Sequence, residues 1–198
     1  VIAGNEPAYR LYESLGFVHF DDRYELAYTP GPQPDPVPLP DGYTVLPCSR
    51  SNWRPRYELS QRITPETVCR YVPVEEGRFR QPWLLRAVAP LFLAAEGLRV
   101  HSYLARQVSS SQVVASARCM VRRRRGGTNR IEVELDPAHA ALAPHLIAET
   151  LRLATSGDAQ HRVELELPRW QSALIEAAQH AGFVLRYTYR SMGLILRP

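Results

Sequence analysis

The sequence predicts an α/β fold in which helices flank a mixed central sheet. The hydrophobic period changes along the chain from helical spacing to strand alternation and back. Two amphipathic segments run through a glycine into a Phe-Val strand, at Gly16 and again at Gly182. Hairpin-like segments in the middle of the order predict antiparallel pairs beside parallel ones, so the sheet is expected to be mixed.

The first expected element is a helix over residues 5–15. Asn5 is a good N-cap, Pro7 suits the first turn because its missing N–H is not needed there, and Gly16 favours a left-handed stop. One face of this helix gathers four residues at helical spacing: Ala8, Leu11, Tyr12 and Leu15. The face is apolar apart from one phenol.

A strand, a turn and a second strand are expected next, over residues 17–20, Asp21-Asp22 and 23–28. Residues 29–41 then form a proline-rich segment, and proline fixes φ and removes a backbone donor. An extended connector between two units is therefore predicted there, with a ligand for a proline-recognising domain as the alternative.

Residues 42–198 contain enough elements for a complete unit. Strands are expected at 43–46, 100–108, 112–123, 129–135, 161–167 and 183–196, the last as one or two strands. Helices are expected at 53–72, 80–96 with an interruption at Pro90, 137–156 and 171–181. Turns are expected at Gly126-Gly127 and Gly157-Asp158.

Composition excludes several classes of protein. No apolar run approaches the roughly 20 residues that span a bilayer, and no signal-peptide pattern is present, so a cytoplasmic protein without a membrane partner is expected. Three widely spaced cysteines indicate neither a disulfide framework nor a zinc cluster. The six histidines lack metal-ligand spacing, and no metal is expected.

The two Gly-Phe-Val segments suggest an internal repeat. They lie 166 positions apart, and each follows an amphipathic helix and leads into a strand. A tandem repeat is therefore expected, in which residues 1–28 are the end of a first copy, 29–41 the linker and 42–198 a second copy. Val1 is then an unexpected natural start, and the rest of the first copy would precede it.

The residues of the opening helix resemble a known motif. Asn5, Ala8, Leu11, Tyr12, Leu15, Gly16 and Phe17 are similar to the N-x-x-A-x-x-L-Y-x-x-L-G-F signature that closes the acetyl-CoA-binding core of the GNAT superfamily of N-acetyltransferases. The element order after residue 42 also resembles a whole GNAT domain. The resemblance implies transfer of an acetyl or other acyl group from acetyl-CoA to the amine of a small molecule or peptide.

The resemblance also implies roles for three residues. Tyr12 stands where the family's general acid serves the departing thiolate, and Asn5 and Ala8 stand where the cofactor arm is met. From the residues alone, the alternative is that Tyr12 is one member of an amphipathic face and Asn5 a helix cap. The pyrophosphate loop and base of that copy would lie upstream.

The second copy departs from the family's pattern. Through the repeat, Asn5 corresponds to Gln171 and Tyr12 to Ala178, so the phenol is lost. The loop over residues 135–144 has neither the glycines nor the basic or amide residue of the family's pyrophosphate loop. Weak or absent binding of CoA is therefore expected in residues 42–198.

Three further patterns each have a functional and a purely structural interpretation, and the structural one is favoured. The pairs Glu132/Glu134 and Glu164/Glu166 would suit a general base but more often mark a solvated sheet face. The run 122–125 is all arginine and would suit nucleic acid, but it has no aromatic residues within it and is expected at a hairpin tip.

The sequence therefore predicts an N-acetyltransferase of tandem GNAT type whose two domains pack together. The upstream copy is expected to be catalytic, the chain itself inactive and a nucleic-acid partner absent. The alternative is a GNAT-fold scaffold or ligand-sensing module without catalysis.

Overall fold

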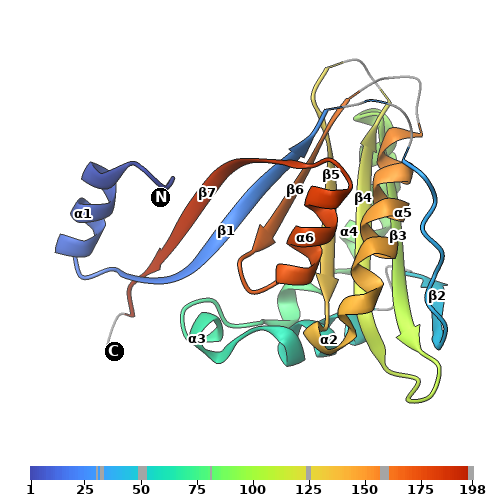
Figure 1. Ribbon diagram of the computed structural model, residues 1–198, viewed down its shortest axis with the longest axis horizontal. Coiled ribbons are helices and arrows are strands. Elements are labelled where there is room, and N and C mark those ends of the chain that lie inside the picture. Colours follow the sequence, from blue (N-terminus) through green and yellow to red (C-terminus); the bar gives the residue numbers. More distant parts are fainter. Residues whose placement is uncertain are drawn as a thin grey trace.

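One seven-stranded sheet forms the centre of the structure (Figure 1). The computed structural model describes residues 1–29, 31, 34–48, 53–80, 82–123, 126–156 and 161–195, without the side chains of 83–87. The strands are β1 (Val18–Tyr28), β2 (Tyr43–Pro47), β3 (Leu98–Gln107), β4 (Val113–Arg122), β5 (Thr128–Leu135), β6 (Arg162–Pro168) and β7 (Val184–Gly193). Their order is β2-β3-β4-β5-β6-β1-β7, and only β5 and β6 pair in parallel. The predicted mixed sheet is confirmed.

Helices cover both faces of this sheet. The helices are α1 (Glu6–Ser14), α2 (Trp53–Ile63), α3 (Glu66–Cys69), α4 (Trp83–Ala95), α5 (Ala143–Thr155) and α6 (Ser172–His180), with 3₁₀ turns η1 (Glu76–Arg78) and η2 (Pro137–Leu142). Figure 1 shows α5 and α6 in front of the sheet and α4 behind it. α1 stands apart, at the far ends of β1 and β7, and none of its residues is buried.

The alternation of β5 decides which residues face which layer. Asn129 donates a hydrogen bond from its side-chain amide to the Ala154 carbonyl of α5 at 2.7 Å. Two residues of opposite parity, Glu132 and Glu134, point to the other face, where the Ser60 hydroxyl of α2 donates to Glu134. Between β5 and α5 lies the main core, which includes Leu146 and other fully buried side chains.

β1 lies inside the sheet, although it precedes the proline-rich segment. It pairs antiparallel with β6 on one side and with β7 on the other, and its Leu26 is 0% exposed. β7 has no other partner strand than β1 in the described part of the chain, apart from an isolated bridge between Ile2 and Tyr189. Residues 18–28 therefore complete the sheet of the unit that follows them, whatever their origin.

Some predicted boundaries are wrong. The turn expected at Asp21-Asp22 does not form: β1 runs through it, with an irregularity in its pairing to β7 between His19 and Asp21, because pairing with Ser191 and Arg190 of β7 holds it extended. Pro90 does not interrupt α4, and residues 137–156 divide into η2, which contains a non-helical His139, and α5, which begins at Ala143. β7 is a single strand. The turn predicted at Gly157-Asp158, the arginines at 124–125 and Leu196 lie outside the described residues.

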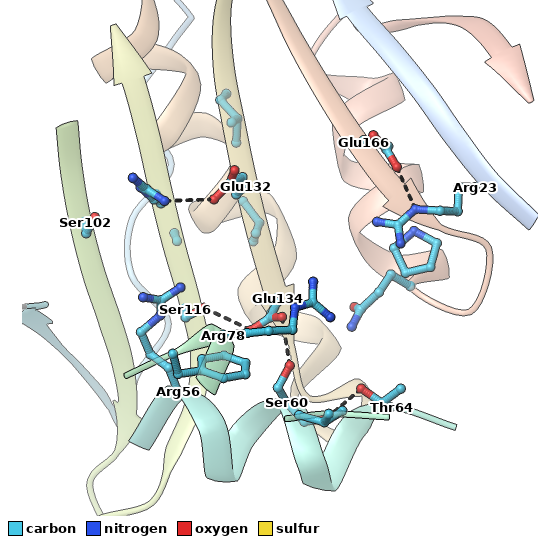
Figure 2. A pocket seen from close by; sticks show the side chains of 18 of the residues that line it. Arg23, Arg56, Ser60, Thr64, Arg78, Ser102, Ser116, Glu132, Glu134 and Glu166 are labelled. Atoms are coloured by element: carbon cyan, nitrogen blue, oxygen red, sulfur yellow. Dashed lines mark hydrogen bonds and ion pairs between the residues drawn. The ribbon is translucent and has the colours of Figure 1, made fainter. Parts of the chain in front are cut away.

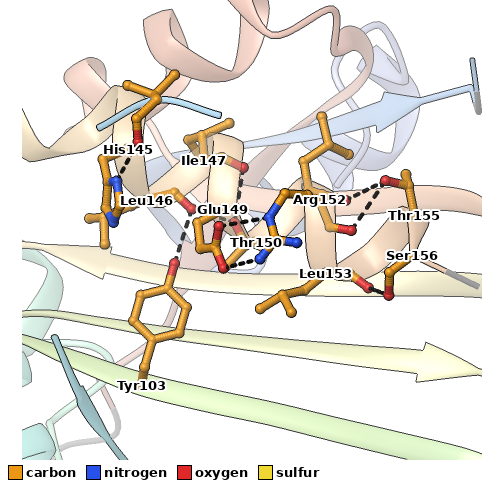
Figure 3. A network of polar contacts seen from close by, with 12 residues as sticks. Tyr103, His145, Leu146, Ile147, Glu149, Thr150, Arg152, Leu153, Thr155 and Ser156 are labelled. Carbon is orange, nitrogen blue, oxygen red and sulfur yellow. Dashed lines mark hydrogen bonds and ion pairs between the residues drawn. The ribbon is translucent and has the colours of Figure 1, made fainter. Parts of the chain in front are cut away.

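The connector is fastened to α5 rather than standing free. Residues 34–40 have no helix or strand, and the Val37 carbonyl accepts a hydrogen bond from Nδ1 of His145 at 2.7 Å. Figure 3 shows this contact beside the polar contacts of α5, among them the ion pair of Glu149 with Arg152. In the same view the buried Tyr103 hydroxyl donates to the Leu146 carbonyl. α5 is thus held to the sheet by a polar contact as well as by packing.

None of the three cysteines forms a disulfide, and only Cys119 is buried. Within the part of the chain that the structure describes, no helix is long and apolar enough to cross a membrane.

Candidate functional site

The three residues that the sequence singled out line one open hollow. Asn5, Ala8 and Tyr12 of the α1 segment contribute to it, together with Phe17, the residue before β1, and Met192 of β7. Its volume is about 440 Å³. Ala8 and Tyr12 share the hollow because residues four apart fall on one helical face.

The start of α1 is built as its sequence predicts. The Asn5 side-chain oxygen accepts a hydrogen bond from the Ala8 backbone N–H at 3.3 Å, which is an N-cap. Gly16 has φ +86°, the left-handed conformation that glycine adopts without strain, and the chain turns there into β1. The Asn5 side chain therefore caps the helix and borders the hollow.

The Tyr12 side chain is well placed to meet a ligand. Its ring packs edge-on against Phe17, with ring centroids 5.3 Å apart, and the residue is 40% exposed. Its hydroxyl makes no hydrogen bond among the described residues, so the O–H is available to another group. A free phenol at the wall of a cavity is compatible with a proton donor, which remains a prediction.

Apolar surface surrounds this hollow. Leu11 and Leu15 of α1 are 58% and 59% exposed, and Val18 is 53% exposed. Further exposed apolar side chains nearby in the chain or at the end of β7 are Ile2, Leu194 and Ile195. Isolated exposed leucines are ordinary, but a helix whose apolar face has no partner is unusual.

Two neighbouring strands of the sheet separate toward their carboxyl ends. β5 and β6 pair only from Thr128–Arg162 to Ile131–Leu165, and their carboxyl-terminal halves are not paired with each other. Gln171, 4% exposed, donates from Nε2 to the Leu135 carbonyl at 2.9 Å, at the end of β5. This carbonyl is therefore already satisfied. Gln171 is the residue that the expected repeat would match with Asn5, but no side-chain hydrogen bond caps α6.

The loop before α5 presents a carboxylate rather than a glycine-rich turn. Asp136 accepts hydrogen bonds from the Ala138 backbone N–H at 3.1 Å and from Arg62 at 2.9 Å. Burial alone would raise the pKa of Asp136, but these hydrogen bonds hold it below its ordinary value. The ionised carboxylate takes up an amide at this turn and repels another anion. This agrees with the expected weak binding of CoA in residues 42–198, which stays a prediction.

A second cavity, of about 420 Å³, lies between α2 and the sheet (Figure 2). Its floor carries Glu134, which accepts hydrogen bonds from the hydroxyls of Ser60 at 3.0 Å and Ser116 at 3.3 Å. Burial raises the pKa of Glu134, while the two hydroxyls and the nearby Arg56 oppose the change. The expectation of a solvated glutamate face is therefore wrong for this residue, because α2 covers it.

Two other carboxylates of this cavity, Glu132 and Glu166, are held in ion pairs. Arg23 contacts Glu166 at 2.6 Å, and Arg118 contacts Glu132 at 3.5 Å (Figure 2). Arg130 lies 3.9 Å from Glu132 and 3.6 Å from Glu166. Of the four glutamates considered from the sequence, Glu134 alone combines two serine hydroxyls with a raised pKa.

Sequence reasoning missed Gln171, Ser60, Ser116 and Arg56 as partners in these sites. The antiparallel register of β4 and β5 places Ser116 directly opposite Glu134. This pairing could have been predicted from the sequence, because the two residues lie on the two strands of one hairpin. The contacts of Ser60 and Gln171 have none, because they join residues 74 and 36 positions apart. In the described part of the chain, no group of His, Cys, Asp and Glu is placed to hold a metal ion.

Comparison with solved structures assigns the fold. The GCN5-related N-acetyltransferase of Sphaerobacter thermophilus is similar over 100% of this chain and 59% of its own, with a TM-score of 0.65 and 19% identity. The GCN5-related N-acetyltransferase of Kribbella flavida matches over 96% and 63%, with a TM-score of 0.54 and 16% identity. A tandem GNAT protein from the clavulanic acid biosynthesis pathway, without AcCoA, matches over 96% and 62%, with a TM-score of 0.55 and 14% identity.

The chain therefore has the GNAT acyl-CoA N-acyltransferase fold, and the resemblance seen in its sequence is confirmed at the level of the fold. It spans less than two thirds of the length of these three structures. No protein-family model and no curated protein matches the sequence.

Proposed function

We propose that this chain is part of a tandem N-acyltransferase that moves an acetyl or other acyl group from acetyl-CoA to an amine. The observation that supports this most is the shared hollow of Asn5, Ala8 and Tyr12. These are the residues for which the sequence resemblance implies contact with acetyl-CoA. The fold that the chain shares with N-acetyltransferases is consistent with the same chemistry.

Tyr12 would serve the departing thiolate. The acceptor amine attacks the thioester carbonyl, a C–N bond forms, and the C–S bond breaks as the electron pair leaves with sulfur. The Tyr12 hydroxyl gives its proton to that sulfur, which makes free CoA the product. The proton lost by the amine goes to a base outside residues 1–28.

The exposed apolar face of α1 supports a two-domain arrangement. In this proposal residues upstream of Val1 pack on Leu11 and Leu15 and supply the pyrophosphate loop and the base. Residues 42–198 are then the partner domain, and the intramolecular contact of two GNAT-like domains covers the surface around the hollow. The acceptor is a small-molecule or peptide amine.

The test is calorimetry with acetyl-CoA and a thiol-release assay with a panel of amines, on this chain and on the longer protein that the proposal implies. We expect Tyr12→Phe to lower kcat of the longer protein by about 10²-fold, the low end for a lost general acid, with little change in KM for acetyl-CoA. Tyr24→Phe, in β1, is the matched control. An unchanged kcat in Tyr12→Phe rejects the role of this phenol.

A scaffold or ligand-sensing module is the second candidate. Two contacts favour it: Gln171 satisfies the Leu135 carbonyl where β5 and β6 separate, and Asp136 accepts a hydrogen bond from the Ala138 N–H before α5. Saturable binding of acetyl-CoA by the isolated chain near the micromolar range would argue against a silent second unit. The absence of acyl transfer by the longer protein with every amine would favour the module.

A further inference from the structure

The cavity under α2 adjoins a second cavity, and arginine side chains lie at the boundary between the two. The neighbouring cavity has a volume of about 310 Å³ and is lined by Phe92 and other residues of α4. Both cavities share six lining residues: Cys48, Arg56, Arg78, Phe79, Ser102 and Arg118. Three of the six carry guanidinium groups, so the boundary between the cavities is strongly cationic.

Within the described part of the chain, two of these arginines form no ion pair, although both lie near enough to Glu134 to oppose the rise of its pKa. Among the residues that the structure describes, Arg56 and Arg78 make no ion pair within 4 Å, whereas Arg118 contacts Glu132. Arg56 lies over the Phe79 ring, 5.8 Å from its centroid, which leaves the edge of the guanidinium open. A guanidinium fork with a free edge matches a carboxylate or a phosphate with two parallel hydrogen bonds.

Acceptor groups lie beside this cationic boundary. Glu134 sits next to Arg78 in Figure 2 and faces the same cavity, with the Ser60 and Ser116 hydroxyls already donating to it. Each carboxylate oxygen accepts more than one hydrogen bond, so Glu134 retains capacity for a donor on a ligand. Charge and hydrogen-bond capacity are thus arranged for a molecule with an anionic group and a neighbouring hydroxyl or amine.

We propose that this chain binds, in the cavity under α2, a small anionic molecule whose carboxylate or phosphate contacts Arg56 and Arg78 and whose hydroxyl or amine group contacts Glu134. The site needs no acyl-CoA and is separate from the hollow at Tyr12. A cavity of this size lies in the range of small-molecule sites, about 300–1,000 Å³. The proposal therefore holds whether or not the chain takes part in acyl transfer.

The test is calorimetry of the chain at constant ionic strength with three probes: citrate, glycerol 3-phosphate and neutral glycerol. We expect saturable binding of citrate or of glycerol 3-phosphate, and none of glycerol. Binding of citrate alone identifies a carboxylate site and binding of glycerol 3-phosphate alone a phosphate site. If neither anion gives saturable heat up to about 20 mM, the binding free energy is weaker than about −2.5 kcal/mol, and the proposal is overturned.

Variants assign the binding to the arginines. Arg56→Gln and Arg78→Gln should each weaken binding by about tenfold, since a charge-assisted hydrogen bond is lost. Arg54→Gln is the control, because it removes an equal charge from the same helix at a side chain that is 77% exposed and paired with Glu58. Arg56→Lys keeps the charge and should give an intermediate loss. Equal binding by wild type, Arg56→Gln and Arg78→Gln rejects the site even if an anion binds.

Discussion

Gln171 donates a hydrogen bond to the Leu135 carbonyl at 2.9 Å, across the place where β5 and β6 separate. The donor directly precedes α6 and the acceptor is the last residue of β5. One side chain therefore joins the start of α6 to the end of β5. Asn5, directly before α1, instead caps its own helix. The amide side chains that precede α1 and α6 therefore make different contacts.

The first prediction concerns this contact. Gln171→Ala should lower the free energy of unfolding by about 1–3 kcal/mol, because it leaves the buried Leu135 carbonyl without its donor. Urea denaturation measures the change. Gln179→Ala, an exposed glutamine of α6, is the control and should stay near wild type. Equal effects of the two substitutions would show that the contact carries no special weight.

The second prediction tests whether β1 is part of the core. Leu26 is 0% exposed between β6 and β7, so Leu26→Ala should cost about 2–5 kcal/mol of unfolding free energy. Leu11→Ala removes the same atoms from a side chain that is 58% exposed and should cost far less. Thermal unfolding followed by circular dichroism distinguishes them. Similar losses would contradict the central place of β1 in the sheet.

Local features of the fold follow from the sequence where the signal itself is local. The helix at Asn5 to Gly16 has a cap, a spaced apolar face and a left-handed stop, and all three are present in the structure. Asp21-Asp22 also has a local signal, that of a turn, but pairing with β7 keeps the backbone extended. The tertiary contacts therefore override the turn propensity there.

In the candidate sites, too, contacts that depend on local spacing could be predicted from the sequence, whereas contacts between distant elements could not. Ala8 and Tyr12 meet in one hollow because helical spacing places them together, which the sequence alone predicts. Glu134 is recognisable as a candidate, but its cover by Ser60 depends on how α2 packs across the sheet. Packing between distant elements has no periodic signal, so the environment of this carboxylate was not predictable.

The third prediction follows from the raised pKa of Glu134. The ordinary pKa of a glutamate is 4.5, and above this pH the folded protein holds the Glu134 proton more tightly than the unfolded chain does. The contribution of Glu134 to stability therefore falls as the pH rises. Glu134→Gln removes that loss. Its melting temperature relative to wild type should therefore rise between pH 4 and pH 7, as scanning calorimetry across this range measures. Glu58→Gln, with a side chain 57% exposed, is the control; a constant or shrinking difference for Glu134→Gln refutes the assignment.

The fourth prediction has the opposite sign. The pKa of Asp136 is lowered from 3.8, because hydrogen bonds from Arg62 and from the Ala138 N–H outweigh its burial. Its contribution to stability is thus present above pH 3.8 and is lost as the pH falls through the lowered value. Asp136→Asn keeps the shape but weakens both hydrogen bonds, which should cost about 1 kcal/mol at pH 7.

The pH dependence of this difference is the decisive measurement. The gap in unfolding free energy between wild type and Asp136→Asn should narrow as the pH falls below 3.8, because the wild-type carboxyl then becomes neutral too. Asp41→Asn, at an exposed residue before β2, should show no such trend. A gap that persists unchanged at low pH would mean that Asp136 acts through its shape rather than its charge. The carboxylate would then not be a reason to expect weak CoA binding at the loop before α5.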